Sequence, residues 1–336
     1  MHRPNITVLG GGSWGSAVAS IAARNAPTLI WARDQQSVAD INERHVNSRY
    51  LGDLPLNPAL TATSDLAEAV GRADVLVVGV PSQACRAVLS EAAEYLRPWV
   101  PVVSLVKGLE QGSRLRITEV VSETLPGHPV GVLNGPNIAR EIVQGYAAAA
   151  TLAMPDQHLA ESLQSLLRST MFRVYTSTDI VGVEVAGALK NIFAIATGFG
   201  DGLEAGDNTR AMVITRSLRE LSRLGVAMGG QEQTFSGLAG MGDLIATCTS
   251  PHSRNRRVGI MLAQGKNLDE IAAELKQVAE GVKSSSVVVE LARQHGVEMR
   301  IAREVDAVIN HGQAVEKAYR GLLREAPEHE FHGESW

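Results

Sequence analysis

The feature that most constrains this chain is a glycine-rich turn near its start, Gly10-Gly11-Gly12-Ser13-Trp14-Gly15. It follows the β-branched run Ile6–Leu9 and opens an alanine-rich helical pattern over Ser16–Arg24. In this strand–turn–helix order, the first glycine allows a tight turn, the second lets the backbone approach a pyrophosphate, and the third lets the helix pack on the strand. The pyrophosphate then lies at the helix N-terminus. The context favours a nicotinamide dinucleotide site over a glycine-rich turn that binds nothing.

The residue that contacts the adenosine ribose is expected about 20 residues after such a turn, beyond the second strand. That strand is predicted over Thr28–Trp31, and Arg33 and Asp34 follow it. A carboxylate accepts a hydrogen bond from the ribose 2′-hydroxyl of NAD, whereas an arginine pairs with the 2′-phosphate of NADP. Because both residue types are present, the cofactor is predicted as NAD(H) or NADP(H). One of the two residues fits the start of a solvated loop equally well.

Short apolar runs alternate with helical patterns through the first half of the chain. Val75–Val80 is nearly all apolar, as expected of a parallel strand covered on both faces. A helix is expected over Ser64–Gly71, after a long connection that carries Leu51–Pro55. This alternation predicts an α/β fold with an N-terminal Rossmann-type, doubly wound sheet. The remaining predicted strands are Val102–Val106, Val130–Leu133, Ala147–Ala153 and Phe172–Tyr175.

The pattern changes after Ser177, and no convincing strand follows. Helices are predicted over Asn208–Leu224 and Leu268–Ala279. A chain of 336 residues is long for a single core, so two domains are expected. We predict a dinucleotide-binding domain over residues 1–178, an all-helical substrate domain over residues 179–324, and a charge-rich flexible tail over residues 325–336.

Composition excludes several classes of protein. A net charge of −5 gives no reason to expect a nucleic-acid partner. Cys85 and Cys248 are far apart and lack metal-ligand spacing, so no metal is predicted and a reducing cytoplasm is expected. The most apolar stretch, residues 181–199, is interrupted by Glu184, Lys190 and Asn191, which argues against a membrane span. The oligomeric state stays open, with a homodimer among the options.

Two lysines are candidates for the chemistry. Lys107 directly follows a predicted strand, and ligands of an open α/β sheet bind beyond the carboxyl ends of its strands. A surface lysine at a strand end is the ordinary alternative. Lys190 interrupts an apolar helix, where a desolvated ammonium would have a pKa suited to proton transfer. Helix periodicity alone instead favours a lysine whose ammonium reaches water.

A third candidate is the cluster Ser253-Arg254-Asn255-Arg256-Arg257, which follows Gly240-Met241-Gly242-Asp243-Leu244. A guanidinium, an amide and free backbone N–H groups at a helix start are suited to a phosphate group. Arginine runs are also common in solvated basic turns. In an acidic chain with a dinucleotide site, the phosphate interpretation is slightly favoured.

Taken in order, these motifs resemble those of bacterial NAD(P)-dependent glycerol-3-phosphate dehydrogenases. The resemblance runs from Asn5 to about Leu323, and several ordered motifs are far more specific than any one of them. Besides the glycine turn and the clusters above, the matching segments are Val80-Pro81-Ser82, Lys107-Gly108-Leu109-Glu110, Gly135-Pro136-Asn137-Ile138-Ala139, Lys190-Asn191 and Val278-Ala279-Glu280-Gly281.

The resemblance implies interconversion of dihydroxyacetone phosphate and sn-glycerol 3-phosphate, which feeds glycerophospholipid synthesis. It implies that Lys190 is the proton donor and acceptor. Asn137 departs from the Thr or Ser that bacterial members usually carry. The residues implied to surround the substrate are Lys107, Gly135, Asn137, Lys190, Asp243, Ser253, Arg254 and Asn255. Those implied to contact the cofactor are Ser13, Trp14, Arg33, Lys107, Ala139, Arg254, Val278 and Glu280, together with Gly10, Gly12 and Gly15 of the turn.

Two alternatives remain at this point. One is a 3-hydroxyacid or 6-phosphogluconate-type dehydrogenase of similar build, against which the Ser253–Asn255 cluster and the position of Asp243 argue. The other is a regulator that senses NAD(H) without turnover, for which Lys107 and Lys190 would be superfluous.

Overall fold

The computed structural model describes residues 3–275 and 279–323. Its first part is built on an eight-stranded sheet with the strand order β10-β9-β8-β7-β6-β1-β2-β5. Every residue of the four-residue central strands is buried, because helices cover both faces. The strands of this sheet are β1 (Ile6–Leu9), β2 (Thr28–Trp31), β5 (Leu60–Thr63), β6 (Val75–Val78), β7 (Val102–Ser104), β8 (Val130–Asn134), β9 (Ala148–Ala153) and β10 (Phe172–Ser177).

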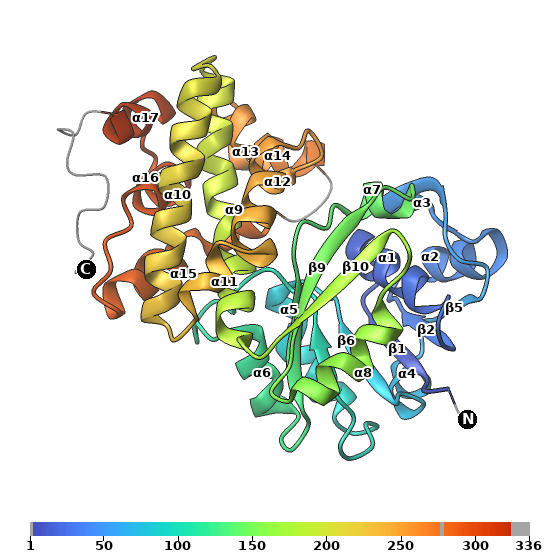
Figure 1. Cartoon of the computed structure of the whole chain (residues 1–336). Coiled ribbons are helices and arrows are strands. Elements are labelled where there is room, and N and C mark those ends of the chain that lie inside the picture. The colour runs from blue at the N-terminus through green and yellow to red at the C-terminus, as the bar shows by residue number, and fades with distance from the viewer. Residues whose placement is uncertain (1–2, 276–278, 324–336) are drawn as a thin grey trace.

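The helices of this part form two layers with separate apolar cores, one on each face of the sheet. One core joins the sheet to α1 (Ser13–Ala22), α7 (Ala139–Val143) and α8 (Gln157–Leu167). The other joins it to α4 (Leu66–Gly71), α5 (Ser82–Ala92) and α6 (Ile117–Thr124). The predicted α/β fold with a doubly wound sheet is thereby confirmed (Figure 1).

The sheet departs from the sequence expectation at one edge. Strands β6, β1, β2, β5, β7 and β8 pair in parallel, but β8 pairs with β9 in antiparallel fashion and β9 with β10 in parallel. The last two strands therefore run against the others. Apolar runs report burial on both faces but not direction, which is why the reversal was not predicted.

The expected long connection after β2 is wrong in detail. It folds into α2 (Gln35–Ala39), a π-helical turn η1 (Asp40–Arg44), the hairpin strands β3 (Val46–Asn47) and β4 (Gly52–Pro55), and a short helix α3 (Ser48–Leu51) between them. Strand β5 was also missed, because its four residues alternate between buried and exposed positions within a polar segment. Helix α1 begins at Ser13, three residues earlier than predicted, directly on the glycine turn.

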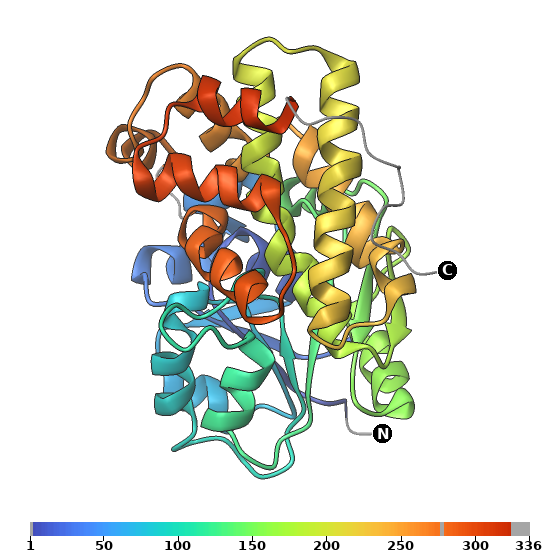
Figure 2. The same ribbon diagram turned by 90° about the vertical axis from the view of Figure 1, so that its left-hand side faces the viewer.

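The second part of the described chain is helical, as predicted, and is organised around α9 (Ile180–Gly202). It stands at one end of the sheet in both views (Figure 1 and Figure 2). The helices and turns around α9 are α10 (Asp207–Ala227), α11 (Glu232–Phe235), η2 (Leu238–Gly242), α12 (Asp243–Thr249), α13 (Arg254–Ala263), α14 (Leu268–Leu275), α15 (Glu280–Gln294), α16 (Arg300–His311) and α17 (Val315–Leu323).

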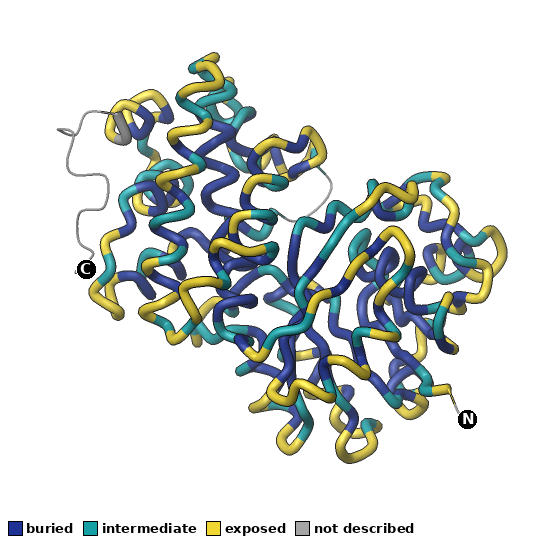
Figure 3. The backbone as a smooth tube through the Cα atoms, viewed as in Figure 1, coloured by how far each residue is buried: buried dark blue, intermediate teal, exposed yellow. Residues whose placement is uncertain are grey.

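Helix α9 is the core of this region. It is the one described helix long and apolar enough to cross a membrane, but 89% of its apolar window is buried inside the protein. Figure 3 shows the same burial as the dark tube at the centre of the helical region. The predicted helix over Leu268–Ala279 is α14 at its start, whereas Ala279 instead precedes α15 as its cap. Val278 and the predicted tail over residues 325–336 lie outside the described residues.

A buried carboxylate connects α9 to the sheet region. The side chain of Glu184 accepts hydrogen bonds from the backbone N–H of Thr118 at 2.8 Å and from Nη1 of Arg116 at 2.9 Å, both at the start of α6. Burial raises the pKa of Glu184, while Arg116 and Thr118 oppose that shift. The contact therefore stabilises the fold only while Glu184, Arg116 and Thr118 are all present, since removing one of them leaves a buried charge or polar group unpaired.

We predict that Glu184→Leu lowers the free energy of unfolding by about 3 kcal/mol, because Arg116 and the Thr118 N–H lose their buried acceptor. Urea unfolding followed by far-ultraviolet circular dichroism measures this loss. The matched control is Glu119→Gln, which removes the more exposed carboxylate on the same arginine but keeps an oxygen for the Arg116 N–H. That change should cost less than about 1 kcal/mol. Equal losses in the two variants would contradict the prediction.

Candidate active site

The candidate site lies where the carboxyl ends of β7 and β8 meet the helical region. Lys107 follows β7, Gly135 and Asn137 follow β8, Lys190 lies within α9, and Asp243 begins α12. In an open α/β sheet this end of the strands is where ligands bind. Four elements that are distant in sequence thus bring charged and polar side chains to one place.

Asp243 joins the two lysines. Its Oδ2 accepts a hydrogen bond from Nζ of Lys107 at 2.8 Å, and its Oδ1 accepts one from Nζ of Lys190. The Asp243 side chain is only 2% exposed, so water does not stabilise the charge of the carboxylate. The two ammonium groups stabilise it instead. Asp243 therefore pairs with Lys190 and with Lys107 alike.

Lys190 does not reach water. The whole residue is 4% exposed, and Nζ also donates to Oγ1 of Thr247 at 2.6 Å. The interpretation of Lys190 as a lysine with a solvated ammonium is therefore wrong. An ammonium has three donors, and Asp243 and Thr247 take two of them. Within the described part of the chain no third acceptor contacts Nζ, so one donor is left for a ligand.

Lys107 has its three donors engaged. Nζ bonds to the carbonyl oxygen of Gly135 at 3.0 Å, to Oδ1 of Asn137 and to Asp243. Burial is the main cause that lowers the pKa of Lys107 to about 7, and the nearby charge of Lys190 adds to it. Asp243 opposes the shift. The surface-lysine interpretation is also wrong, since the side chain is 16% exposed.

Asn137 presents a donor to the site. Because a lysine ammonium can only donate, the amide oxygen of Asn137 must be the atom that faces Lys107. The amide nitrogen Nδ2 is then buried without a hydrogen-bond partner among the described residues. An unpaired buried donor is costly. It marks a position where an acceptor from a ligand would be stabilising.

Gly135 can hold its place only because it lacks a side chain. A Cβ there would lie 2.7 Å from Cα of Ala150 and 2.8 Å from the carbonyl oxygen of Ala149 in β9. The close approach of β9 sets the direction of the Gly135 carbonyl that Lys107 contacts.

The Ser253–Asn255 cluster lies at the start of α13, as predicted. The hydroxyl of Ser253 caps the helix by accepting from the N–H of Arg256, and Arg254 is exposed as the first helical residue. Asn255 is buried and donates to Oδ1 of Asn191 at 2.9 Å. Its own oxygen accepts from the N–H of Gly281.

Asn191 extends this network to the lysines. Its Nδ2 donates to the backbone carbonyl of Lys107 at 2.9 Å. The phosphate candidates on α13 and the lysine cluster are thus parts of one connected arrangement.

The glycine turn has the geometry that the dinucleotide prediction requires. A Cβ on Gly10 would lie 2.7 Å from the Gly79 backbone, and one on Gly15 would lie 2.1 Å from the Gly10 carbonyl oxygen. Both positions therefore need glycine for close packing. A Cβ on Gly12 would meet nothing within 4 Å. The second glycine thus faces open space at the N-terminus of α1, where a pyrophosphate would lie.

Several of the other predicted cofactor residues lie at the starts of helices. Ser13 and Trp14 begin α1, and the indole N–H of Trp14 is buried without a partner among the described residues. Ala139 begins α7. Glu280 begins α15 and accepts a hydrogen bond from the hydroxyl of Ser82 at 2.7 Å.

Beyond β2, Arg33 is exposed, whereas the Asp34 carboxylate caps α2. The helical cap is thus the role that the described structure gives to Asp34.

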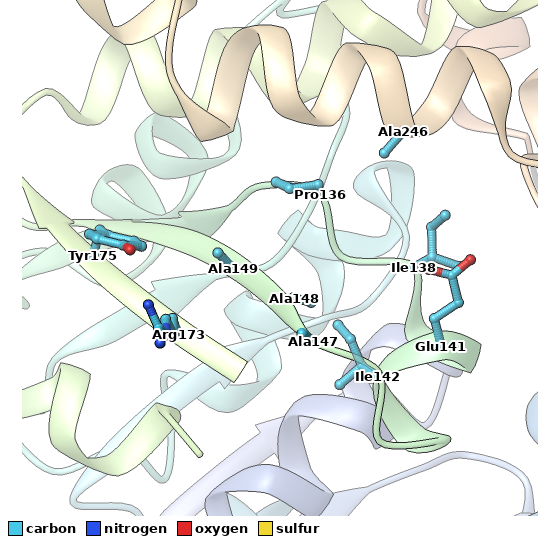
Figure 4. Close-up of a pocket in the computed structure, with 10 residues that line it drawn as sticks. All are labelled: Pro136, Ile138, Glu141, Ile142, Ala147, Ala148, Ala149, Arg173, Tyr175 and Ala246. Atoms are coloured by element: carbon cyan, nitrogen blue, oxygen red, sulfur yellow. The ribbon is translucent and has the colours of Figure 1, made fainter. Parts of the chain in front are cut away.

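An open cavity of about 500 Å³ adjoins the site (Figure 4). Pro136 and Ile138, on either side of Asn137, line it together with Ala246 of α12, Arg173 and Tyr175. Neither site lysine lines it. The cavity therefore lies beside the lysine cluster rather than around it.

Sequence reasoning missed Thr247 and the structural role of Asn191. Thr247 lies one helical turn after Asp243, so its spacing was a usable signal once Asp243 was suspected. Asn191 was visible beside Lys190, but its partners, Lys107 after β7 and Asn255 on α13, depend on packing between distant segments.

Comparison with known proteins identifies the family. A family model described as the NAD-dependent glycerol-3-phosphate dehydrogenase N-terminus matches residues 5–160, and one described as the C-terminus matches residues 179–320. The chain is 63% identical to a Mycobacterium avium glycerol-3-phosphate dehydrogenase [NAD(P)+] over 334 residues, which cover 99% of this chain and 98% of that protein. It is 48% identical to the Thermobifida fusca protein of the same name, covering 98% and 99% of the two chains.

A solved structure agrees. The crystal structure of glycerol-3-phosphate dehydrogenase from Coxiella burnetii superposes with a TM-score of 0.92 at 35% identity, covering 96% of this chain and 99% of that one. The resemblance seen in the motifs therefore extends over sequence and fold alike. The chain belongs to the NAD-dependent glycerol-3-phosphate dehydrogenase family.

Proposed function

We propose that this NAD(P)-dependent glycerol-3-phosphate dehydrogenase interconverts dihydroxyacetone phosphate and sn-glycerol 3-phosphate with Lys190 as the proton donor and acceptor. The observation that carries the assignment is the buried ammonium of Lys190, held by Asp243 and Thr247 with one donor left over. Because the chain belongs to this family, we no longer interpret it as a hydroxyacid dehydrogenase or as a non-catalytic sensor.

The residues present fit a nicotinamide dinucleotide. Gly12 leaves open space at the N-terminus of α1, and Trp14, in the first turn of that helix, has an indole N–H without a partner among the described residues. Gly10, Gly12, Ser13, Trp14 and Gly15 would hold the pyrophosphate side, and Arg33, Ala139, Arg254, Val278 and Glu280 would contribute further contacts. When bound, the nicotinamide ring supplies or accepts the hydride at C2 of the substrate.

Lys190 manages the charge that develops on the substrate oxygen. In the reducing direction its free N–H donates to the carbonyl oxygen at C2, stabilises the negative charge that forms there, and supplies the proton. In the oxidising direction the amine removes the hydroxyl proton. Asp243 and Thr247 hold Nζ in one position throughout, so little reorganisation is required.

Lys107 supports this geometry. Its Nζ donates to the carbonyl oxygen of Gly135 and to the amide oxygen of Asn137, which fixes the positions of both. It also shares the Asp243 carboxylate with Lys190. It contributes positive charge next to an anionic substrate. The Nδ2 of Asn137, which has no partner among the described residues, would donate a hydrogen bond to a substrate oxygen.

The start of α13 would hold the substrate phosphate. Ser253 offers a hydroxyl, Arg254 a guanidinium and Asn255 its remaining amide hydrogen at the helix N-terminus. Holding the phosphate fixes C2 relative to Lys190, and such positioning accounts for much of the rate that enzymes achieve.

We place this activity in the cytoplasm, as a step toward glycerophospholipids, and keep the homodimer as a prediction. The burial of α9 supports a soluble enzyme. Light scattering coupled to gel filtration tests the dimer. The domain division at residues 178 and 179 is proposed as well, and it is supported by the end of β10 at Ser177 and the start of α9 at Ile180.

The central test is Lys190→Ala. We expect kcat to fall by at least about 10², the scale of general acid–base catalysis, because alanine has no group that can donate to the substrate oxygen. Oxidation of the reduced cofactor with dihydroxyacetone phosphate measures kcat, and cofactor binding should persist. Lys266→Ala, an exposed lysine paired with Glu274, is the matched control. Near-normal turnover in Lys190→Ala would refute the assignment.

Arg254→Ala should raise KM for dihydroxyacetone phosphate by about tenfold or more, because a charge-assisted contact with the phosphate is lost. The control is Arg257→Ala, on the same helix but paired with Glu274 at 3.9 Å. It should leave KM within about twofold. An unchanged KM in Arg254→Ala would remove this residue from the phosphate site.

The third test is pH dependence. A lysine loses its charge as pH rises through its pKa, which is about 7 for Lys107. We therefore expect kcat/KM for the anionic substrate to fall as pH rises above about 7, and the fall to be absent from Lys107→Gln. The second ionisation of the substrate phosphate, near pH 6, acts below this range. A wild-type profile that stays level from pH 7 to 9 would contradict the role of Lys107.

A further inference from the structure

We infer that Arg49 joins Arg33 in holding the adenosine 2′-phosphate of NADP(H), so that the chain binds NADP(H) more tightly than NAD(H). The inference rests on the proposed dinucleotide site and deepens it, since the sequence left Arg33 and Asp34 as equal alternatives. Arg49 lies in α3, 15 residues after Asp34, and no motif points to it.

The first step is the commitment of Asp34. Its Oδ2 accepts from the N–H of Ser37 at 3.1 Å and from the Ser37 hydroxyl, which makes it the N-cap of α2. The hydrogen bonds from Ser37 lower the pKa of Asp34, so the carboxylate stays ionised. It therefore cannot donate to a phosphate, and it needs a cation beside it before a phosphate could approach.

Arg49 is that cation. Its Nη1 lies 3.6 Å from Oδ2 of Asp34, and its guanidinium lies 5.5 Å from the centre of the Tyr50 ring. The side chain is 60% exposed. At this distance the contact with Asp34 is an exposed ion pair without a hydrogen bond, a weak interaction. The guanidinium can thus turn its remaining donors to a doubly charged phosphate and gain hydrogen bonds.

The backbone around Arg49 is tied to the glycine turn. Asn47, which is fully buried, donates through Nδ2 to the carbonyl oxygen of Gly11 and to the hydroxyl of Ser16, each at 2.8 Å. Ser48 follows Asn47 and begins α3, and Arg49 is the next residue. The hydrogen bonds of Asn47 therefore fix the backbone that carries Arg49.

The end of β2 is tied to the same turn. A Cβ on Gly11 would lie 2.7 Å from Cβ of Ala32, the residue before Arg33. A dinucleotide with its pyrophosphate at the turn has its adenosine ribose beyond the end of the second strand. Arg33 and Arg49 therefore belong to one rigid frame with the pyrophosphate site.

The balance of charge favours the phosphate. Arg33 is exposed, and its guanidinium has no ion pair or hydrogen bond within residues 3–275 and 279–323. Two arginines against one carboxylate leave a net positive charge for a group of charge near −2. Oδ1 of Asp34 takes no part in the cap, so NAD(H) can still be accepted, with a ribose hydroxyl donating to that oxygen. The chain should bind both cofactors and prefer the phosphorylated one.

Binding of fragments to the full-length protein tests this without turnover. Isothermal titration calorimetry compares adenosine 2′,5′-bisphosphate with adenosine 5′-monophosphate, which lacks only the 2′-phosphate. In the wild-type protein the bisphosphate should bind at least about tenfold more tightly. Arg49→Gln should reduce that ratio by about tenfold, the scale of one charge-assisted hydrogen bond, and leave the monophosphate within about twofold. Arg33→Gln should act in the same way.

The matched control is Arg44→Gln, an exposed arginine of the same segment that pairs with Asp40 and Asp53. It should leave the ratio unchanged. An unchanged ratio in Arg49→Gln, or an equal weakening of both ligands, would overturn the inference, since the first excludes a phosphate contact and the second indicates a structural role.

The proposed function is tested separately, by turnover of dihydroxyacetone phosphate with the wild-type protein. Normal turnover with an unchanged ratio in Arg49→Gln refutes only the role of Arg49. Absent turnover with the expected loss of preference refutes the proposed reaction and supports the role of Arg49.

Discussion

The arrangement of the site depends on one buried carboxylate shared by two ammonium groups. Asp243 holds Lys107 at the end of β7 and Lys190 inside α9, so it links the sheet to the helical region. Each of these charges would be costly to bury alone. Together they form a set in which removing any one leaves the others uncompensated. The same contact thus stabilises the junction between the regions and brings the two lysines to one carboxylate.

The two lysines differ in what their surroundings leave available. The three donors of Lys107 bond to Gly135, Asn137 and Asp243. Burial lowers the pKa of Lys107 to about 7, because its effect outweighs the attraction of Asp243. Lys190 donates to Asp243 and Thr247, and its third donor has no acceptor among the residues that the structure describes. A count of donors therefore separates a lysine whose donors are all engaged from one that has a donor available for the substrate in the proposed mechanism. Residue type alone could not make this distinction.

Much of the fold could be predicted from local pattern, because the apolar strands and the glycine turn report burial and backbone geometry directly. Strands β1 and β2 have the predicted bounds. The reversed direction of β9 and the hairpin of β3 and β4 could not be predicted, since they depend on pairing between segments. The burial of Lys190 was hidden for the same reason: α10, α12, α13 and α15 cover α9, and helix periodicity says nothing of how many sides are covered.

The pair Arg33 and Asp34 shows where a motif stops being informative. By spacing both residues qualify as the one that contacts the ribose, and the sequence offers no ground for choosing. The choice depends on which hydrogen bonds each side chain already makes. Asp34 accepts from Ser37 as a helix cap, whereas the Arg33 guanidinium has no partner among the described residues. Arg49 enters only through the fold, because Asn47 anchors its segment at the glycine turn. The cofactor preference of this enzyme is therefore determined less by which residues follow β2 than by which of their polar atoms the local structure leaves free.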